Sequence, residues 1–179
     1  MHNLIPILAI VCWVLPWPQS VRADASVSLY LQKQLSGAEL VGEGRLRIMV
    51  WDIYDARLWS KNGVYDVKLP FLLELSYLRP IKGHEIADKS AEEIRRQGLK
   101  DEIKIAAWHR QLRRIMPNVE KGVTLSGFAN AEKHTVFFRD GVEIGRIEDP
   151  DFTKYFFDIW LGPQTSHPRL RAQLTGQKR

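Results

Sequence analysis

The sequence contains one cysteine, Cys12, among 179 residues. A single thiol cannot form an intramolecular disulfide. Cys12 also lies in a segment that we expect to be removed, so the mature chain should hold neither a disulfide nor a cysteine-ligated metal. The five histidines lack ligand-like spacing, because His84-Glu85 is followed by Ile-Ala-Asp rather than by the second histidine of a zinc-protease helix. We therefore expect no metal centre.

Motifs for covalent and cofactor chemistry are missing as well. Leu125-Ser126-Gly127 lacks the paired glycines that surround the serine of a nucleophile elbow. Gly42-Glu43-Gly44 is not followed by a helical pattern, which excludes a dinucleotide fingerprint and a phosphate-binding loop. We expect no cofactor.

Long hydrophobic runs are also absent. The apolar run from Leu4 to Leu15 spans about 12 residues, whereas a membrane-spanning helix needs roughly 20. The run is followed by prolines and small residues, which predicts a signal peptide over residues 1–23, cleaved after Ala23 or Ala25. An uncleaved anchor is the alternative, since no Lys or Arg precedes the run. We expect a periplasmic domain over residues 24–179 with no integral membrane segment after cleavage.

The composition is that of one globular domain, with 45% hydrophobic and 26% charged residues. The net charge of +5 favours anionic partners without indicating a polybasic tail. The helical arginines are interleaved with acidic residues that include Glu92 and Glu93, which predicts a solvated helix face. We therefore expect no nucleic-acid partner. Four tryptophans outside the leader lie in periodic apolar settings, and we expect them in the core; they are Trp51, Trp59, Trp108 and Trp160.

The hydrophobic periodicity predicts an α+β domain with an antiparallel sheet. Turn signals lie at Ser60-Lys61-Asn62-Gly63 and at Asp140-Gly141. The expected strands cover 41–59, bent or bulged midway, 71–78, 123–129, 134–139 and 142–147, and the expected helices cover 84–97, 101–116, 151–161 and 167–174.

One strand breaks its own alternation. Asp52 falls on the face that carries Leu46 and Tyr54, and a carboxylate among apolar neighbours is costly unless it is paired. Arg45 or Arg47 could supply the partner. Three interpretations stay open: a polar cluster that orients an amphipathic ligand in an apolar cleft, a buried structural Asp–Arg pair, or a register shift that places Asp52 outside.

Several blocks of the sequence resemble the bacterial chalcone isomerase-like proteins. This resemblance implies an open-faced β-sandwich, in which a curved antiparallel sheet carries helices on one side and a ligand cleft lies between them. The blocks are Gly42-Glu43-Gly44-Arg45-Leu46, Trp51-Asp52-Ile53-Tyr54-Asp55-Ala56, Tyr77 to Gly83, Ile86-Ala87-Asp88-Lys89-Ser90, Asp140-Gly141, Asp149-Pro150 with Phe152, and Phe156 to Gly162 followed by Thr165-Ser166 and Pro168.

The resemblance does not imply the plant reaction, which closes a chalcone to a flavanone. The plant enzymes use an arginine and a threonine from early strands and a tyrosine and an asparagine on the helix after a Pro-x-x-Gly turn. Aligning that turn on Pro80 to Gly83 puts Ile86 at the tyrosine and Glu93 at the asparagine. Ile86 has no hydroxyl, and an ionised Glu93 accepts hydrogen bonds where an amide could donate. Asp52 stands at the threonine, and Arg45 is the nearest match to the arginine.

The resemblance also extends to non-catalytic plant members that hold a fatty-acid carboxylate with an arginine and a tyrosine. We therefore favour a carrier of a small amphipathic or fatty-acid-like ligand, with Arg45 as anion anchor, Tyr54 as donor and Asp52 as orienter of the arginine. The first alternative is an intramolecular lyase or isomerase with Asp52 as general base and Arg45 as oxyanion stabiliser. The second is a partner-docking module of the envelope with a closed cleft.

Overall fold

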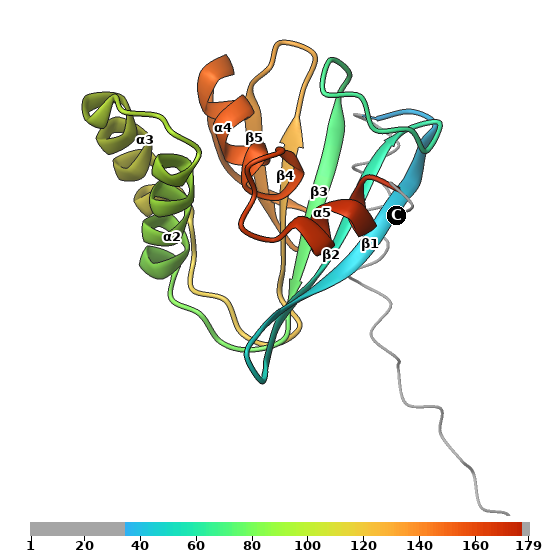
Figure 1. Ribbon diagram of the computed structural model, residues 1–179, viewed down its shortest axis with the longest axis horizontal. Helices are drawn as coiled ribbons and strands as arrows, with labels where there is room; N and C mark the ends of the chain where they lie inside the picture. Colours follow the sequence, from blue (N-terminus) through green and yellow to red (C-terminus); the bar gives the residue numbers. More distant parts are fainter. Residues whose placement is uncertain (1–34, 177–179) are drawn as a thin grey trace, which may run out of the picture.

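Four helices lie on one side of a six-stranded antiparallel sheet in the computed structural model, which describes residues 35–176 (Figure 1). The α+β prediction and the open-faced architecture are confirmed. The expected signal peptide over residues 1–23 lies outside the described residues. In chain order the elements are β1 (Ala38–Ile48), β2 (Trp51–Lys61), β3 (Phe71–Tyr77), α2 (Gly83–Arg96), α3 (Glu102–Ile115), β4 (Thr124–Ala129), β5 (Thr135–Arg139), β6 (Val142–Ile147), α4 (Pro150–Leu161) and α5 (Pro168–Leu174).

The strands neighbour one another in chain order, from β1 to β6, and helices α2 and α3 form an excursion between β3 and β4. Both turn signals are confirmed. Asn62 and Gly63 after β2, and Asp140 and Gly141 between β5 and β6, all have positive φ. Asp140 and Gly141 form a two-residue hairpin turn, and positive φ at both positions matches the right-handed twist of β5 and β6.

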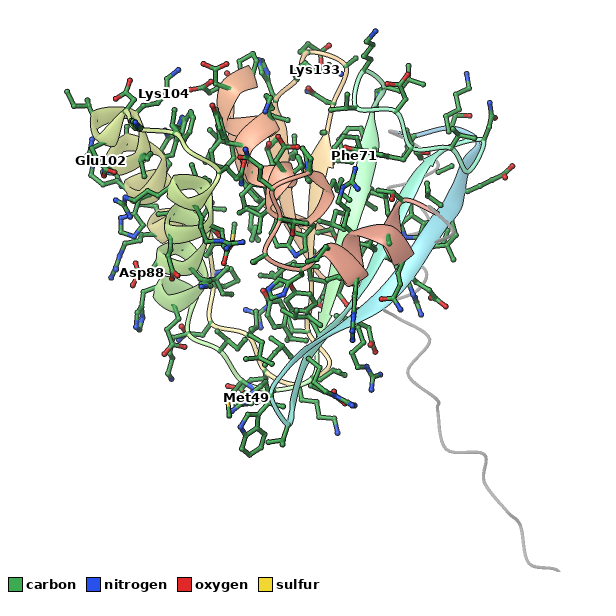
Figure 2. The ribbon with its side chains drawn as sticks, viewed as in Figure 1. Met49, Phe71, Asp88, Glu102, Lys104 and Lys133 are labelled. Atoms are coloured by element: carbon green, nitrogen blue, oxygen red, sulfur yellow. The ribbon has the colours of Figure 1, made fainter. Side chains whose placement is uncertain are left out.

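The predicted single strand over 41–59 is wrong, because the chain reverses at Met49 and Val50 to form the β1–β2 hairpin. No Gly, Asn or Asp marks this turn, although Met49 adopts a φ of 54°. The side chains at the tip are exposed, 89% for Met49 and 81% for Val50, and Met49 lies at the far end of the hairpin (Figure 2). Trp51 is also exposed, against the core prediction, and the guanidinium carbon of Arg79 lies 4.7 Å from its ring centroid.

A β-bulge in the same hairpin decides which way Asp52 faces. Leu46 pairs with Tyr54 and Arg47 pairs with Asp52, so Ile53 is an extra residue in β2. An extra residue shifts the side-chain alternation by one. Asp52 therefore leaves the face of Leu46 and Tyr54, and the expectation that it shares this apolar face is wrong. The register shift left open above is what the structure contains.

Helix α5 lies directly against the backbone of β1. A Cβ atom at Gly42 would overlap the carbonyl oxygen of Gln173 and lie 2.7 Å from that of Leu174. At Gly44 it would lie 2.8 Å from Cδ1 of Leu170. The absence of side chains at Gly42 and Gly44 thus allows α5 to pack closely against β1.

We expect Gly42→Ala to lower the free energy of unfolding by about 1–3 kcal/mol, because the new methyl group must push α5 away from β1. Urea unfolding of the purified protein measures the change. Glu43→Ala is the matched control on the same strand. Its side chain pairs with the exposed Arg57, so its effect should stay within about 0.5 kcal/mol. Equal effects of the two substitutions would show that α5 tolerates displacement.

The main hydrophobic core lies between the sheet and the helices. Trp108 and Trp160 belong to it, as predicted. A smaller cluster, which the partly buried Trp59 joins, occupies the other face of the sheet and contains Leu35, Leu72, Phe128, Val136 and Phe138. Within residues 35–176, no helix has the length and apolar character needed to cross a membrane.

Candidate ligand-binding cavity

A cavity of about 310 Å³ lies between the helix side of the sheet and helices α2 and α4. Its size falls at the lower end of the range of about 300–1,000 Å³ that is typical of small-molecule sites. The lining is mostly apolar. It includes Leu73, Leu75 and Leu125 from the sheet, Ile86 from α2, and Phe156 and Ile159 from α4.

Two tyrosines from neighbouring strands line this cavity. Tyr54 and Tyr77 contact each other edge to face, with ring centroids 5.7 Å apart. Nε1 of Trp160 donates a 2.8 Å hydrogen bond to the Tyr54 hydroxyl oxygen. The Tyr77 side chain is 3% exposed and makes no side-chain hydrogen bond within residues 35–176. Burial raises the pKa of both phenols, which keeps both protonated and able to donate.

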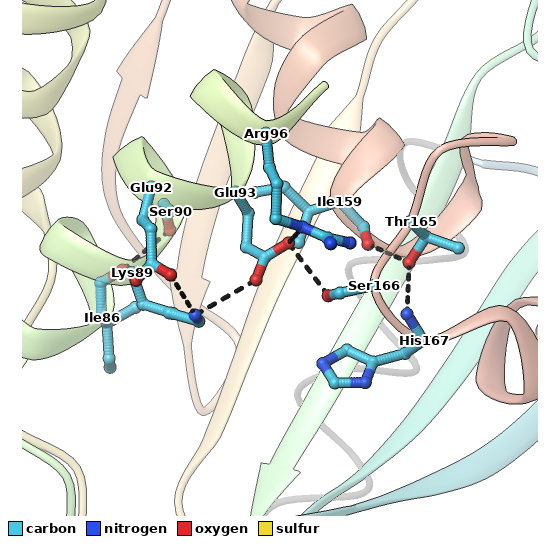
Figure 3. Close-up of polar contacts among 10 residues, drawn as sticks. All are labelled: Ile86, Lys89, Ser90, Glu92, Glu93, Arg96, Ile159, Thr165, Ser166 and His167. Carbon is cyan, nitrogen blue, oxygen red and sulfur yellow. Dashed lines mark hydrogen bonds and ion pairs between the residues drawn. The ribbon is translucent and has the colours of Figure 1, made fainter. Parts of the chain in front are cut away.

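A buried carboxylate, Glu93 of α2, lines the same cavity, and its side chain is 8% exposed (Figure 3). Lys89 Nζ lies 3.2 Å from its Oε1, while Arg96 Nε, at 3.3 Å, and Ser166 Oγ, at 2.9 Å, contact its Oε2. Burial raises its pKa, but hydrogen bonds from Ser166 and Lys89 outweigh burial and hold the pKa below the ordinary value. Glu93 is thus an ionised side chain inside the fold, and its predicted place on a solvated helix face is wrong.

His167 contributes an imidazole from the connection between α4 and α5. Its backbone N–H donates to Thr165 Oγ1 at 3.1 Å, and Thr165 Oγ1 donates to the carbonyl oxygen of Ile159 at 2.6 Å. These bonds fix the connection against the end of α4. Burial lowers the pKa of His167 below its ordinary value, so the imidazole is neutral at pH 7.

The structure places only one of the three predicted site residues, Tyr54, in the cavity lining. Arg45 lies on the other face of β1, where it binds Asp55 through two hydrogen bonds of 2.6 and 2.9 Å and Asp52 through one of 3.1 Å. Arg47 Nε also donates to Asp52, at 2.6 Å. This ionic network is partly exposed, and the hydrogen bond from Arg47 is the largest favourable cause of the lowered pKa of Asp52.

The ligand-binding roles assigned to Arg45 and Asp52 gain no support from this placement. The same holds for Asp52 as a general base, because a lowered pKa and a position away from the cavity both disfavour that role. The role of Tyr54 as a hydrogen-bond donor stays a prediction.

The lining residues that were not predicted as site residues include Tyr77, Lys89, Glu93 and His167. A usable signal existed on α2, because Ile86, Ser90 and Glu93 follow at positions i, i+4 and i+7 and so share one helix face. Alignment on the Pro80 to Gly83 turn also points to Ile86 and Glu93. His167, in a connection, offered no periodic signal.

The chemistry of this site suits binding by burial and hydrogen bonding. The apolar lining accepts a hydrocarbon, and hydroxyl, carboxylate, ammonium and imidazole groups lie beside it. In the described part of the chain, no three His, Cys, Asp or Glu side chains are grouped so that they could hold a metal ion.

Comparisons with known proteins agree with this architecture. A family model described as chalcone isomerase-like matches residues 39–176. An uncharacterized protein of Haemophilus influenzae is 26% identical over 126 residues, which cover 70% of this chain and 61% of that relative, so the chain spans only about three fifths of the relative's length. The crystal structure of a fatty-acid binding protein from Arabidopsis thaliana gives a TM-score of 0.60 at 8% identity, covering 78% of this chain and 87% of that one. At this identity the similarity establishes the fold alone.

Proposed function

This chain belongs to the chalcone isomerase-like family, and from that premise we propose that it is a non-catalytic binding protein for a small amphipathic, fatty-acid-sized ligand. The ligand tail occupies the cavity between the sheet and helices α2 and α4. In this proposal the protein acts in the periplasm, after export directed by residues 1–23.

The observation that carries the proposal is the cavity itself, an apolar space of about 310 Å³ bordered by hydrogen-bonding groups. The similarity to a solved structure described as a fatty-acid binding protein supports it further. Burial of a ten-carbon tail contributes about 8 kcal/mol before the costs of association. Polar contacts at the head group therefore decide whether binding reaches the micromolar range.

The two alternatives have less support. A lyase of the plant type would need a hydroxyl at the position where Ile86 lines the cavity. A lyase with Asp52 as general base would need Asp52 in the cavity, and Asp52 faces away from it. A docking module with a closed cleft would need side chains to fill the space, and the space is open.

We expect the protein, purified without detergent, to release an amphipathic small molecule on solvent extraction, detected by mass spectrometry. We also expect it to bind the neutral fluorophore N-phenyl-1-naphthylamine and to release it when a C12 lipid is added. Ile86→Trp, at a half-buried lining position, fills the space and should weaken probe binding by at least tenfold. Leu125→Phe is a second filling variant, in case the first side chain turns outward.

Arg45→Ala is the matched control, because Arg45 lies outside the cavity; its probe affinity should equal that of the wild type. The proposal is abandoned if the protein yields no extracted ligand and no titratable probe site, or if the two filling variants bind as tightly as the control.

A further inference from the structure

We propose that the cavity selects an amphipathic ligand whose head is an uncharged oxygen group, such as an ester, ketone or alcohol, and disfavours a free carboxylate. This inference rests on the proposed function and specifies the ligand class of the same site. Three features of the lining carry it: the balance of charge, the burial of Glu93 and the two tyrosine donors.

The charged side chains that line the cavity do not attract an anion. They are Glu85, Lys89 and Glu93, so one positive and two negative charges give a formal charge of −1. Lys89 is already shared by two carboxylates, with Nζ 2.8 Å from Oε1 of Glu92 and 3.2 Å from Oε1 of Glu93. Arg96, the other cation of this group, is also paired with Glu93.

Because Glu93 is buried, loss of its ion pair with Lys89 or Arg96 would cost free energy. A ligand carboxylate entering beside it would have to share Lys89 or Arg96, which would leave one of two buried acids without full compensation. A buried, uncompensated charge is strongly unfavourable. His167 offers no fixed positive charge at pH 8, since burial holds its pKa below the ordinary value.

The tyrosine pair supplies donors instead. The Tyr54 oxygen accepts from Trp160, which leaves its own O–H free to donate, and the Tyr77 hydroxyl has no side-chain partner within residues 35–176. A neutral carbonyl oxygen has two lone pairs and can accept hydrogen bonds from phenol O–H groups. Burial is the main cause of the raised pKa of Tyr54, and the charge of Glu93 adds to it. The same burial and negative charge that disfavour ionisation of the phenol also disfavour an ionised carboxylate head group at this position.

The test compares three C12 ligands at pH 8, each used below the concentration at which it forms micelles: methyl dodecanoate, dodecan-1-ol and dodecanoate. Each displaces N-phenyl-1-naphthylamine from the full-length protein. Neutral heads also partition more strongly out of water, so the quantity that decides is the ratio of ester affinity to dodecanoate affinity in each variant. In the wild type we expect this ratio to exceed ten.

Glu93→Gln removes the buried charge at nearly constant shape and should reduce the ratio at least tenfold. Glu92→Gln is the matched control, since Glu92 also contacts Lys89 but is exposed and does not line the cavity; its ratio should stay within twofold of the wild type. Tyr77→Phe removes one donor and should weaken ester binding by about fivefold.

Tighter binding of dodecanoate than of the neutral ligands overturns the inference and leaves the proposed function standing. Equal changes in the ratio for Glu93→Gln and Glu92→Gln overturn it too. If none of the three ligands displaces the probe, the proposed function fails together with the inference. Tighter binding of dodecanoate by the wild type would overturn the inference even if Glu93→Gln did not fold.

Discussion

Replacing Phe152 by alanine is expected to lower the free energy of unfolding by about 3–5 kcal/mol, the usual cost of truncating a fully buried aromatic side chain. Phe152 of α4 has no exposed surface. Its ring stacks on Phe156 at 5.2 Å and meets the edges of Trp108 of α3, at 5.6 Å, and Phe137 of β5, at 6.3 Å. The substitution therefore opens a hole where α3, α4 and the sheet meet.

Thermal unfolding measures this effect directly. For a chain of this size, a loss of 3–5 kcal/mol corresponds to a decrease in Tm of roughly 6–20 °C. Tyr155→Ala, on the same helix but half-buried, is the control and should cost less than half as much. Because Phe152 does not line the cavity, any residual folded protein should keep its probe affinity. A decrease in Tm of under 3 °C would show that the aromatic cluster repacks.

Asp149→Ala is expected to lower the free energy of unfolding by about 2–4 kcal/mol. Its Oδ1 accepts hydrogen bonds from the N–H groups of Asp151, at 2.9 Å, and Phe152, at 3.2 Å, and so caps α4. Its Oδ2 accepts a 2.8 Å bond from Nε1 of Trp108 in α3. The substitution removes the cap and leaves a buried indole N–H without an acceptor. Asp151→Ala, at an exposed position of the same turn, should cost less than about 1 kcal/mol.

The contribution of Asp149 also depends on pH. Burial raises its pKa, but the hydrogen bonds from Trp108 and the helix N–H groups outweigh burial, so the folded pKa lies below the ordinary value. The stabilisation is therefore fully present above about pH 4 and is lost as the pH falls through the lower folded pKa. Urea unfolding of the wild type and of Asp149→Asn should differ clearly at pH 7 and less at pH 3. If the two proteins differed in unfolding free energy by the same amount at pH 7 and pH 3, the charge of the carboxylate would not contribute to the stabilisation.

Most of the fold could be predicted because its elements carry strong local signals. The helices after β3 and β6 have clear apolar faces and end near Gly98, Pro117 and Gly162, and two turns carry residues suited to positive φ. The β1–β2 hairpin could not be predicted, because its turn uses Met49 and Val50 and the apolar alternation continues through it. Trp51 was misplaced for the same reason.

The site was predicted less well than the fold, because its location depends on long-range packing. The Asp52 prediction assumed an unbroken alternation, and the extra residue Ile53 invalidated it. In the sequence Glu93 resembles a solvated residue in a charged helix, and its burial depends on tertiary contacts such as the hydrogen bond from Ser166 of the α4–α5 connection. Tyr77 lies at the end of the apolar strand β3, so the sequence did not distinguish it from the core residues of that strand.

Because of the extra residue in β2, the two faces of the β1–β2 hairpin have different surroundings. On one face the side chains of Arg45, Arg47 and Asp52 are partly exposed, while on the other Ile53 and Tyr54 line the apolar cavity. Loss of that single residue would rotate the acid inward without any amino-acid substitution. Deletion of Ile53 is therefore expected to place a carboxylate beside the apolar lining of the cavity.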